Sequence, residues 1–344
     1  MIPYIRRCLQ AIQRSECISK MSVSVLICCH NSKDRITRTL EAVARCEANF
    51  QVEVVLIDNY STDRTAQTAR DVWARLDTPF RFRVVSEPKL GLAYARRRGV
   101  LEADHEFLVF CDDDNWLSRD YLSIAAEILA DPKVGATGGQ AEPIFDGAVP
   151  PFVYSHGDYL ALGIQAISSG DVTHSRGFLW GAGLAVRRSD LLSIYRCPVF
   201  PILTGRAGAF SFTMGDDNEI CWALTVLGKK LVYDNRLKLY HFMPPERLKI
   251  EYLRKLMDGA GWHGRIDRFA SGLNAIDNDG RMRVGFKSLF NWLRSFHQLE
   301  ERRYHASIFC AACGRTSMMD ELERKLYVAS QWLRATRNSS IRIS

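Results

Sequence analysis

Short apolar runs alternate with amphipathic stretches in the first third of this chain, and this alternation limits the possible folds more than any other feature. Residues 22–29 read SVSVLICC, and similar runs follow at 52–57, 82–85 and 106–111. Continuous runs of this length are typical of strands buried on both faces of a parallel sheet. The stretches between them carry apolar residues at helical spacing. The pattern predicts an α/β fold, with a doubly wound, mainly parallel sheet and right-handed crossovers.

The charge of the chain is concentrated near its C-terminus. The net charge is +7, and residues 246–344 hold 18 Lys and Arg against 11 Asp and Glu, which accounts for the whole excess. This region reads as helical, with Trp262, Trp292 and Trp332 among its amphipathic stretches. Two interpretations remain open, a contact with an anionic membrane surface and a helical cap or dimer face. We expect no nucleic-acid partner, because the excess is mild and no recognition motif is present.

The cysteines and the N-terminal segment bear on the compartment. Ten Cys in 344 residues are too few for a disulfide scaffold, and this usage fits a reducing cytoplasm. Cys310 and Cys313 form a lone CxxC, which reads either as two packed thiols or as half of a metal site.

Residues 1–20 lack an apolar signal core, and no apolar run is long enough to span a membrane. Because Met21 directly precedes the first apolar run, residues 1–20 read as a basic extension or as an artefact of start-codon choice.

Three consecutive aspartates follow the fourth apolar run. Asp112, Asp113 and Asp114 stand at the carboxyl end of a predicted buried strand, and ligands bind at that edge of open α/β sheets. Repulsion among three carboxylates is most simply offset by a hard divalent cation, Mg²⁺ or Mn²⁺. In extended geometry Asp112 and Asp114 point the same way, so we predict these two as the metal pair. The alternative is an acidic turn that caps the next helix, although a cap needs only one acid.

A second acidic group appears about a hundred residues later, in the segment MGDDNEICW. Asp216, Asp217 and Glu219 fall at a predicted helix N-terminus, where the helix dipole favours ionised carboxylates. One of them facing a cleft would suit a general base, and helix capping is the alternative. Two other nucleotide-binding motifs, GxGxxG and the P-loop, are absent. Phosphates would therefore be held by a metal and by basic side chains.

Five segments, taken in order, resemble the family 2 glycosyltransferases of the GT-A fold: VSVLICCHNS, VVLIDNYSTDRT, GLAYARRRGV, FLVFCDDDNWL and GDDNEICWAL. They fall within residues 22–245. The resemblance implies an inverting transfer of a sugar from a nucleotide diphosphate sugar. It also implies a divalent metal cofactor, Mn²⁺ or Mg²⁺.

The resemblance assigns a nucleotide site to five positions. Asp58 matches the family's aspartate that reads the base, usually uracil, and Asn31 lines the same pocket. Arg96 matches the basic residue near the diphosphate. Asp112 and Asp113 complete the expected nucleotide-binding set.

The resemblance also assigns the metal ligands and the base. Asp112 and Asp114 match the DxD motif, and Asp217 matches the catalytic aspartate that takes a proton from the acceptor hydroxyl. His241 stands where some GT-A enzymes place a third metal ligand, although a lone His after a strand is often structural. Two departures from the family pattern are GDD in place of a GED-type motif and Arg97 where Asn is frequent. Residues 180–183, WGAG, would let the backbone approach the sugar or would only pack tightly.

These assignments divide the chain into an N-terminal extension (1–20), a GT-A domain (21–245) and a helical basic C-terminal region (246–344). The domain is expected to have a nucleotide-binding half (21–116) and an acceptor half (117–245). We expect a cytoplasmic, metal-dependent hexosyltransferase of surface polysaccharide or glycan biosynthesis. Its partners would be a nucleotide diphosphate sugar, with uracil as the expected base, and a glycan or lipid-linked acceptor. Residues 246–344 would make a peripheral contact at the inner face of the cell membrane.

Two other functions compete with this one. A non-catalytic sugar-nucleotide-binding homologue would be expected to lose the metal aspartates or the base, and this chain keeps all of them. A nucleotidyltransferase would share the sheet and the metal acids. The second acidic group and the YHF segment after it favour glycosyl transfer.

Overall fold

The computed structural model describes residues 21–203, 215–258 and 319–341, with scattered positions between 269 and 311. Several sequence predictions lie outside these residues: the 1–20 extension, Trp262, Trp292, Cys310 and Cys313.

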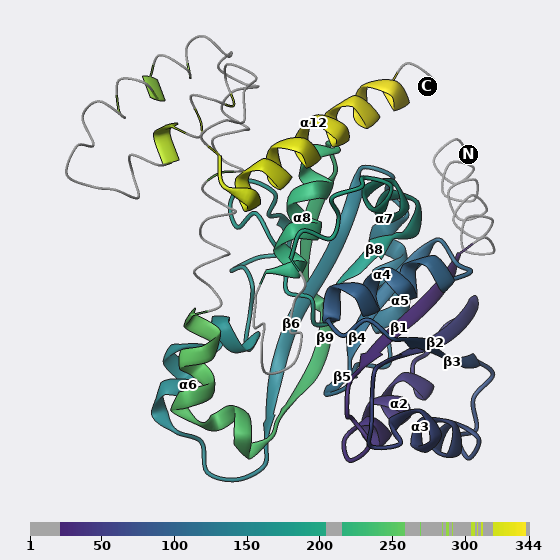
Figure 1. Cartoon of the computed structure of the whole chain (residues 1–344). Helices are drawn as coiled ribbons and strands as arrows, with labels where there is room; N and C mark the ends of the chain where they lie inside the picture. Colours follow the sequence, from purple (N-terminus) through teal and green to yellow (C-terminus); the bar gives the residue numbers. More distant parts are fainter. Residues whose placement is uncertain are drawn as a thin grey trace, which may run out of the picture.

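A single mixed sheet runs through the described part of the chain (Figure 1). Its strand order is β3-β2-β1-β4-β8-β6-β9-β5, and β7 pairs with β9. The first four strands in this order are parallel to one another, β6 is parallel to β9, and β8, β5 and β7 pair antiparallel with their neighbours. The strands are β1 (Ser22–Cys29), β2 (Gln51–Asn59), β3 (Arg81–Glu87), β4 (Phe107–Asp112), β5 (Asn115–Leu117), β6 (Val134–Phe145), β7 (Gly170–Asp171), β8 (Ala185–Arg187) and β9 (Lys230–Met243).

Helices cover both faces of this sheet. Successive strand residues point to opposite faces and therefore pack into two different cores. In β1, Leu26 packs into the core beneath α4, α7, α8 and α12, whereas Ile27 packs into the core beneath α2, α3 and α5. This three-layer arrangement confirms the predicted α/β class with a mainly parallel sheet. The helices are α2 (Ile36–Ala44), α3 (Thr65–Trp73), α4 (Leu92–Glu102), α5 (Tyr121–Leu129), α6 (Pro151–Ser155), α7 (Arg188–Tyr195), α8 (Asp216–Val226) and α12 (Glu321–Ile341), with 3-10 turns η1 (Gly157–Leu160) and η3 (Pro245–Leu248).

Two details differ from the sequence prediction. The segment 178–188 reads as one strand, but only Ala185–Arg187 is extended. Gly183 has φ +74° and its carbonyl accepts a hydrogen bond from the Tyr121 hydroxyl at 2.6 Å, so the chain turns there instead of continuing a ladder. In contrast, the segments KLVYD (230–234) and LKLYHF (237–242), which read as two short strands in the sequence, belong to the single strand β9.

The described part of the C-terminal region packs on the domain. Helix α12 lies beside α8 (Figure 1), and its residues Leu326, Ala329 and Leu333 are buried in the same core as α8. Trp332 packs against that core while partly exposed. Among the described residues, no helix is both long enough and apolar enough to cross a membrane.

Candidate functional site

A pocket opens where the parallel strands β1, β2 and β4 end, which is the ligand-binding edge of an open α/β sheet. The parallel register sets Cys28 of β1 beside Asp112 of β4, so the ends of the two strands are level. Arg247 of the 3-10 turn η3 also lines the pocket. Its lining residues are Cys28, Cys29, His30, Arg35, Asn59, Leu92, Ala95, Asp112, Asp113, Asp114 and Arg247.

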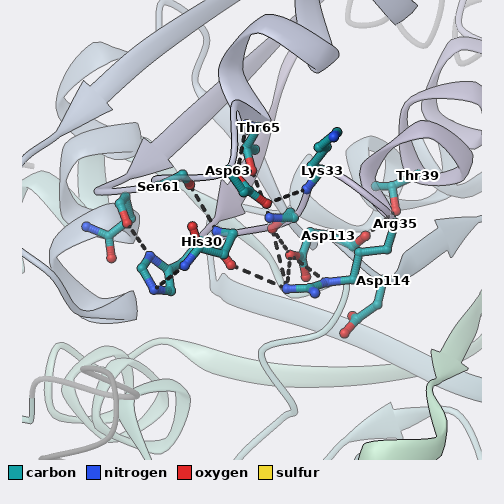
Figure 2. A network of polar contacts seen from close by, with 12 residues as sticks. His30, Lys33, Arg35, Thr39, Ser61, Asp63, Thr65, Asp113 and Asp114 are labelled. Carbon is teal, nitrogen blue, oxygen red and sulfur yellow. Dashed lines mark hydrogen bonds and ion pairs between the residues drawn. The ribbon is translucent and has the colours of Figure 1, made fainter.

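The carboxylate of Asp113 turns toward the start of α2, where Arg35 and Ser32 hold it (Figure 2). Arg35 Nη2 lies 2.8 Å from Asp113 Oδ2, and the Ser32 hydroxyl donates to the same oxygen. The Thr39 hydroxyl donates to the Asp113 carbonyl at 2.9 Å. Burial and the neighbouring Asp114 carboxylate raise the pKa of Asp113 despite these partners. Asp113 therefore ties the strand end to α2.

Asp114 turns the other way, toward η3 and β9. Arg247 Nη2 lies 2.6 Å from Asp114 Oδ2, and His241 Nε2 lies 3.5 Å from Asp114 Oδ1. The Asp114 side chain is 2% exposed, so this carboxylate is surrounded by protein. Burial lowers the pKa of His241, which outweighs the attraction of Asp114 for a charged imidazole. The ring is therefore a neutral group beside the carboxylate.

Asp112 faces a third arginine, on α4. Arg96 Nη2 lies 3.9 Å from Asp112 Oδ1, while Arg96 Nη1 donates to Asp216 Oδ2 at 2.6 Å. Arg96 is 3% exposed. Burial opposes its charge, but the carboxylates of Asp216 and Asp112 outweigh burial and raise the pKa of Arg96. Arg96 thus joins the first acidic group to the second.

Asp217 stands beside this junction, in the first turn of α8. Its Oδ2 accepts a hydrogen bond from the backbone N–H of Gly181 at 2.8 Å, and its Oδ1 accepts from the N–H of Asn218 at 3.0 Å. A Cβ at Gly181 would collide with the Arg96 guanidinium. The WGAG segment therefore approaches both charged groups closely because residue 181 has no side chain.

Glu219, the third acid of the second group, points away from the pocket. Its two carboxylate oxygens accept hydrogen bonds from the N–H groups of Ile202 (2.6 Å) and Leu203 (2.9 Å). Burial raises the pKa of Glu219 to about 8, although these two hydrogen bonds act in the opposite direction. Glu219 holds the backbone at 202–203 against α8.

Asn31 and Asp58, predicted to bind the nucleotide, lie at the same sheet edge but not among the residues lining the pocket. Asn31 has φ +50° and joins two loops: its Oδ1 accepts from the N–H of Thr62 at 2.8 Å. Asp58 is the last residue but one of β2 and lies beside Cys29 of β1, and its Oδ1 accepts from the N–H of Ser61 at 3.3 Å. Both side chains therefore shape the turn after β2.

The donor set around Asp114 suits a hard divalent cation in part. Two adjacent ligand atoms of an octahedral ion, each about 2.1 Å from the metal, lie about 3 Å from each other. Asp114 Oδ1 and His241 Nε2 are separated by 3.5 Å. Within the described residues, no three His, Cys, Asp or Glu side chains are gathered for one metal ion. Mg²⁺ is commonly held by one or two carboxylates, water and substrate phosphates, so the residues present fit a cation whose coordination is completed by water or by a phosphate group.

Sequence reasoning missed three pocket residues, His30, Arg35 and Arg247. His30 Nδ1 donates to the Asn59 carbonyl at 2.8 Å, which links the ends of β1 and β2. Arg35 and Arg247 are the counter-ions of Asp113 and Asp114. The excess of carboxylates signalled that cations were needed, but nothing in the sequence indicated which arginines would supply them.

Solved structures with a similar shape include S. aureus TarS 1-349 in complex with UDP. It is 18% identical, covers 94% of this chain and 92% of that chain, and has a TM-score of 0.48. A structure of GalNAc-T7 with UDP, GalNAc and Mn²⁺ is 16% identical over 69% of this chain and 48% of that chain, with a TM-score of 0.49. Because both TM-scores are below 0.5, these two likenesses carry no argument about the site.

Curated relatives match about a third of the chain. EpsH of Bacillus subtilis (strain 168), named as a candidate glycosyltransferase, is 30% identical over 29% of this chain and 28% of its own length. The poly(ribitol-phosphate) beta-N-acetylglucosaminyltransferase TarS of Staphylococcus aureus (strain Mu50 / ATCC 700699) is 27% identical over 32% of this chain and 19% of its own length. The matched stretch thus spans less than a third of either relative.

The family comparison covers β1 through α7, which includes the three aspartates and Arg96. Residues 24–193 match the family described as Glycosyl transferase family 2. This chain therefore carries a family 2 glycosyltransferase domain.

Proposed function

We propose that this chain is a metal-dependent, inverting glycosyltransferase that moves a sugar from a UDP-linked donor to a hydroxyl acceptor of a growing surface polysaccharide or glycan. The observation that carries the proposal is the junction at Arg96. This guanidinium contacts Asp112 of the first acidic group and Asp216 of the second, and Asp217 is the next residue in the chain after Asp216. The family 2 domain supports a nucleotide-sugar donor.

Residues of the pocket and of the segments beside it hold different parts of the donor. Asp58 and Asn31, at the ends of β2 and β1, receive the base and ribose. Asp112 and Asp114, with His241, would hold a divalent cation, which would neutralise the charge that grows on the diphosphate as it leaves. Arg35 keeps Asp113 turned toward α2, so this third carboxylate adds less repulsion at the diphosphate.

Asp217 serves as the general base. The two backbone N–H groups that hold its carboxylate fix its direction, and further oxygen lone pairs remain to accept a proton. The acceptor oxygen attacks the anomeric carbon as Asp217 removes its proton, and the bond from that carbon to the diphosphate breaks on the opposite face. One displacement needs one base and no protein nucleophile, so the product has inverted configuration.

The acceptor is proposed to be a glycan or a lipid-linked sugar reached from the inner face of the cell membrane. The excess of basic residues in 246–344 supports a peripheral contact with anionic lipid. The packing of α12 on α8 gives that region a fixed connection to the domain.

Screening a panel of nucleotide sugars tests the function directly. The readout is release of the nucleoside diphosphate by the full chain with Mn²⁺ or Mg²⁺, compared with EDTA. We expect release from a UDP sugar with either metal and little release in EDTA. Equal turnover in EDTA would contradict metal dependence, and no release from any donor by a folded chain would contradict the enzyme assignment.

A further inference from the structure

Arg247 lies between Asp114 and His241, two of the three side chains proposed as metal ligands. It comes from the turn η3, outside the residues that match the family, and it lines the same pocket as the three aspartates. Its Nη2 contacts Asp114 Oδ2 at 2.6 Å, and its Nη1 lies 3.3 Å from His241 Nε2. One guanidinium therefore engages both side chains.

The hydrogen bonds define which nitrogen of His241 faces Arg247. A backbone carbonyl only accepts hydrogen bonds, so the contact of His241 Nδ1 with the Ala161 carbonyl at 3.3 Å requires a proton on Nδ1. Because a guanidinium only donates, His241 Nε2 must present its lone pair to Arg247. A metal ion at His241 would bind this same lone pair, so Arg247 and a cation exclude one another at Nε2, and they would also compete for the charge of the Asp114 carboxylate, whose Oδ2 contacts Arg247 and whose Oδ1 lies beside Nε2.

Arg247 remains charged in this position. Burial disfavours the charged guanidinium, but the facing carboxylate of Asp114 and its neighbours Asp113 and Asp112 outweigh burial and raise the pKa of Arg247. A buried arginine displaced from a carboxylate needs another anion close by, because an unpaired buried charge is costly. The diphosphate of the donor is the anion that the proposed function brings into this pocket.

We propose that Arg247 exchanges partners during donor binding. In the structure it neutralises Asp114 and contacts His241 Nε2. Asp114 and His241 release it when they ligate a divalent cation, and its guanidinium then binds a diphosphate oxygen. The exchange couples cation binding to nucleotide binding. A cation that binds alone leaves Arg247 without a carboxylate partner, and a diphosphate that binds alone finds Arg247 still paired with Asp114. The inference rests on the proposed function.

Calorimetry on the full chain tests the exchange, with Arg247→Gln as the variant and Lys249→Gln as the control. Lys249 is exposed and stands two residues further along the same segment. Mn²⁺ alone should bind Arg247→Gln about tenfold more tightly than wild type, because the competing guanidinium is gone. UDP at saturating Mn²⁺ should bind about tenfold more weakly, which is the size of an ordinary coupling between sites. Lys249→Gln should change neither constant.

The outcomes separate this inference from the proposed function. A wild-type chain that binds neither Mn²⁺ nor UDP contradicts the proposed function. A wild-type chain that binds both, with Mn²⁺ affinity unchanged or lower in Arg247→Gln, overturns the competition. Tighter Mn²⁺ binding with unchanged UDP binding overturns the contact with the diphosphate.

A crystal structure of the wild-type chain with Mn²⁺ and UDP provides a test that does not depend on a variant's folding. The guanidinium of Arg247 should lie on a diphosphate oxygen and no longer on Asp114. An Arg247–Asp114 pair retained in the presence of both ligands would overturn the exchange.

Discussion

Arg96 and Asp216, which lie 120 residues apart in the chain, form a buried ion pair with 2.6 Å between Nη1 and Oδ2. The sequence suggested helix capping for Asp216, but its side chain instead pairs with Arg96, and no side-chain cap hydrogen bond is made at Gly215, the residue that precedes α8. The pair connects α4 to α8 across the site. Asp216 is therefore a structural partner of Arg96, which leaves its neighbour Asp217 as the proposed base.

Replacing Asp216 should cost stability. Asp216→Asn removes the charge that compensates the buried Arg96 guanidinium, and breaking a buried pair costs about 3 kcal/mol of unfolding free energy. Urea titration followed by circular dichroism measures this change. The control is Asp158→Asn, which removes the exposed partner of Arg176; an exposed pair contributes about 1 kcal/mol or less. Equal losses of unfolding free energy in the two variants would show that the Arg96–Asp216 pair stabilises the fold no more than the Arg176–Asp158 pair does.

Replacing Asp217 should abolish most of the transfer without loss of stability. Asp217→Asn keeps a side-chain oxygen for the Gly181 N–H but cannot accept a proton. The rate of transfer should fall by about 10²–10⁴-fold, the usual contribution of a positioned general base. UDP affinity, measured by calorimetry, should stay near the wild-type value. An Asp217→Asn chain that retains its turnover would move the role of base to another carboxylate.

Asp58 should matter for the nucleotide and little for the fold. Asp58→Asn keeps an acceptor for the Ser61 N–H, so the turn after β2 is retained, whereas Asp58→Ala loses it. Both variants should bind UDP at least tenfold more weakly, because a hydrogen bond to a charged group contributes about 1.5–3 kcal/mol. Calorimetry checks this, with the exposed Asp71→Asn as control. Unchanged affinity in both Asp58 variants would remove Asp58 from the nucleotide site.

A side chain at residue 181 should disturb the two charged groups together. The Cβ added by Gly181→Ala would collide with the Arg96 guanidinium, and the Gly181 N–H holds Asp217. We expect lower stability and at least tenfold slower transfer, since a small misplacement of a catalytic group costs up to about 10²-fold. Gly138→Ala is the control, because a Cβ there would find its nearest atom at 3.4 Å. Similar activity in both variants would show that the approach at Gly181 is not needed.

Glu219 should make the stability fall as the pH rises. Folding raises its pKa from the ordinary 4.5 to about 8, so the folded chain keeps a proton that the unfolded chain has lost within that window. The contribution of Glu219 is complete below pH 4.5 and is lost as the pH rises through about 8. Urea titrations at pH 5, 7 and 9 measure this slope, which Glu219→Gln should reduce. An identical slope in the variant would place the titrating group elsewhere.

The amino-acid sequence by itself determined the fold class and the general position of the site. Runs such as 22–29 and 106–111 are apolar at most positions, which is typical of strands covered on both faces, and the structure places them in adjacent parallel strands. Since parallel strands end at one edge, the position of Asp112 at the end of its strand already indicated the edge of the sheet where the pocket lies.

Only the tertiary structure decided how the charges pair. Asp112, Asp113 and Asp114 are consecutive, yet they face Arg96, Arg35 and Arg247, which come from α4, the start of α2 and η3. Strand β4 ends at Asp112, so the two-residue alternation that predicted where these side chains point does not extend to the next two. Ion pairing depends on distances between segments far apart in the chain, and those distances follow from the order and register of the strands, which local sequence patterns do not encode.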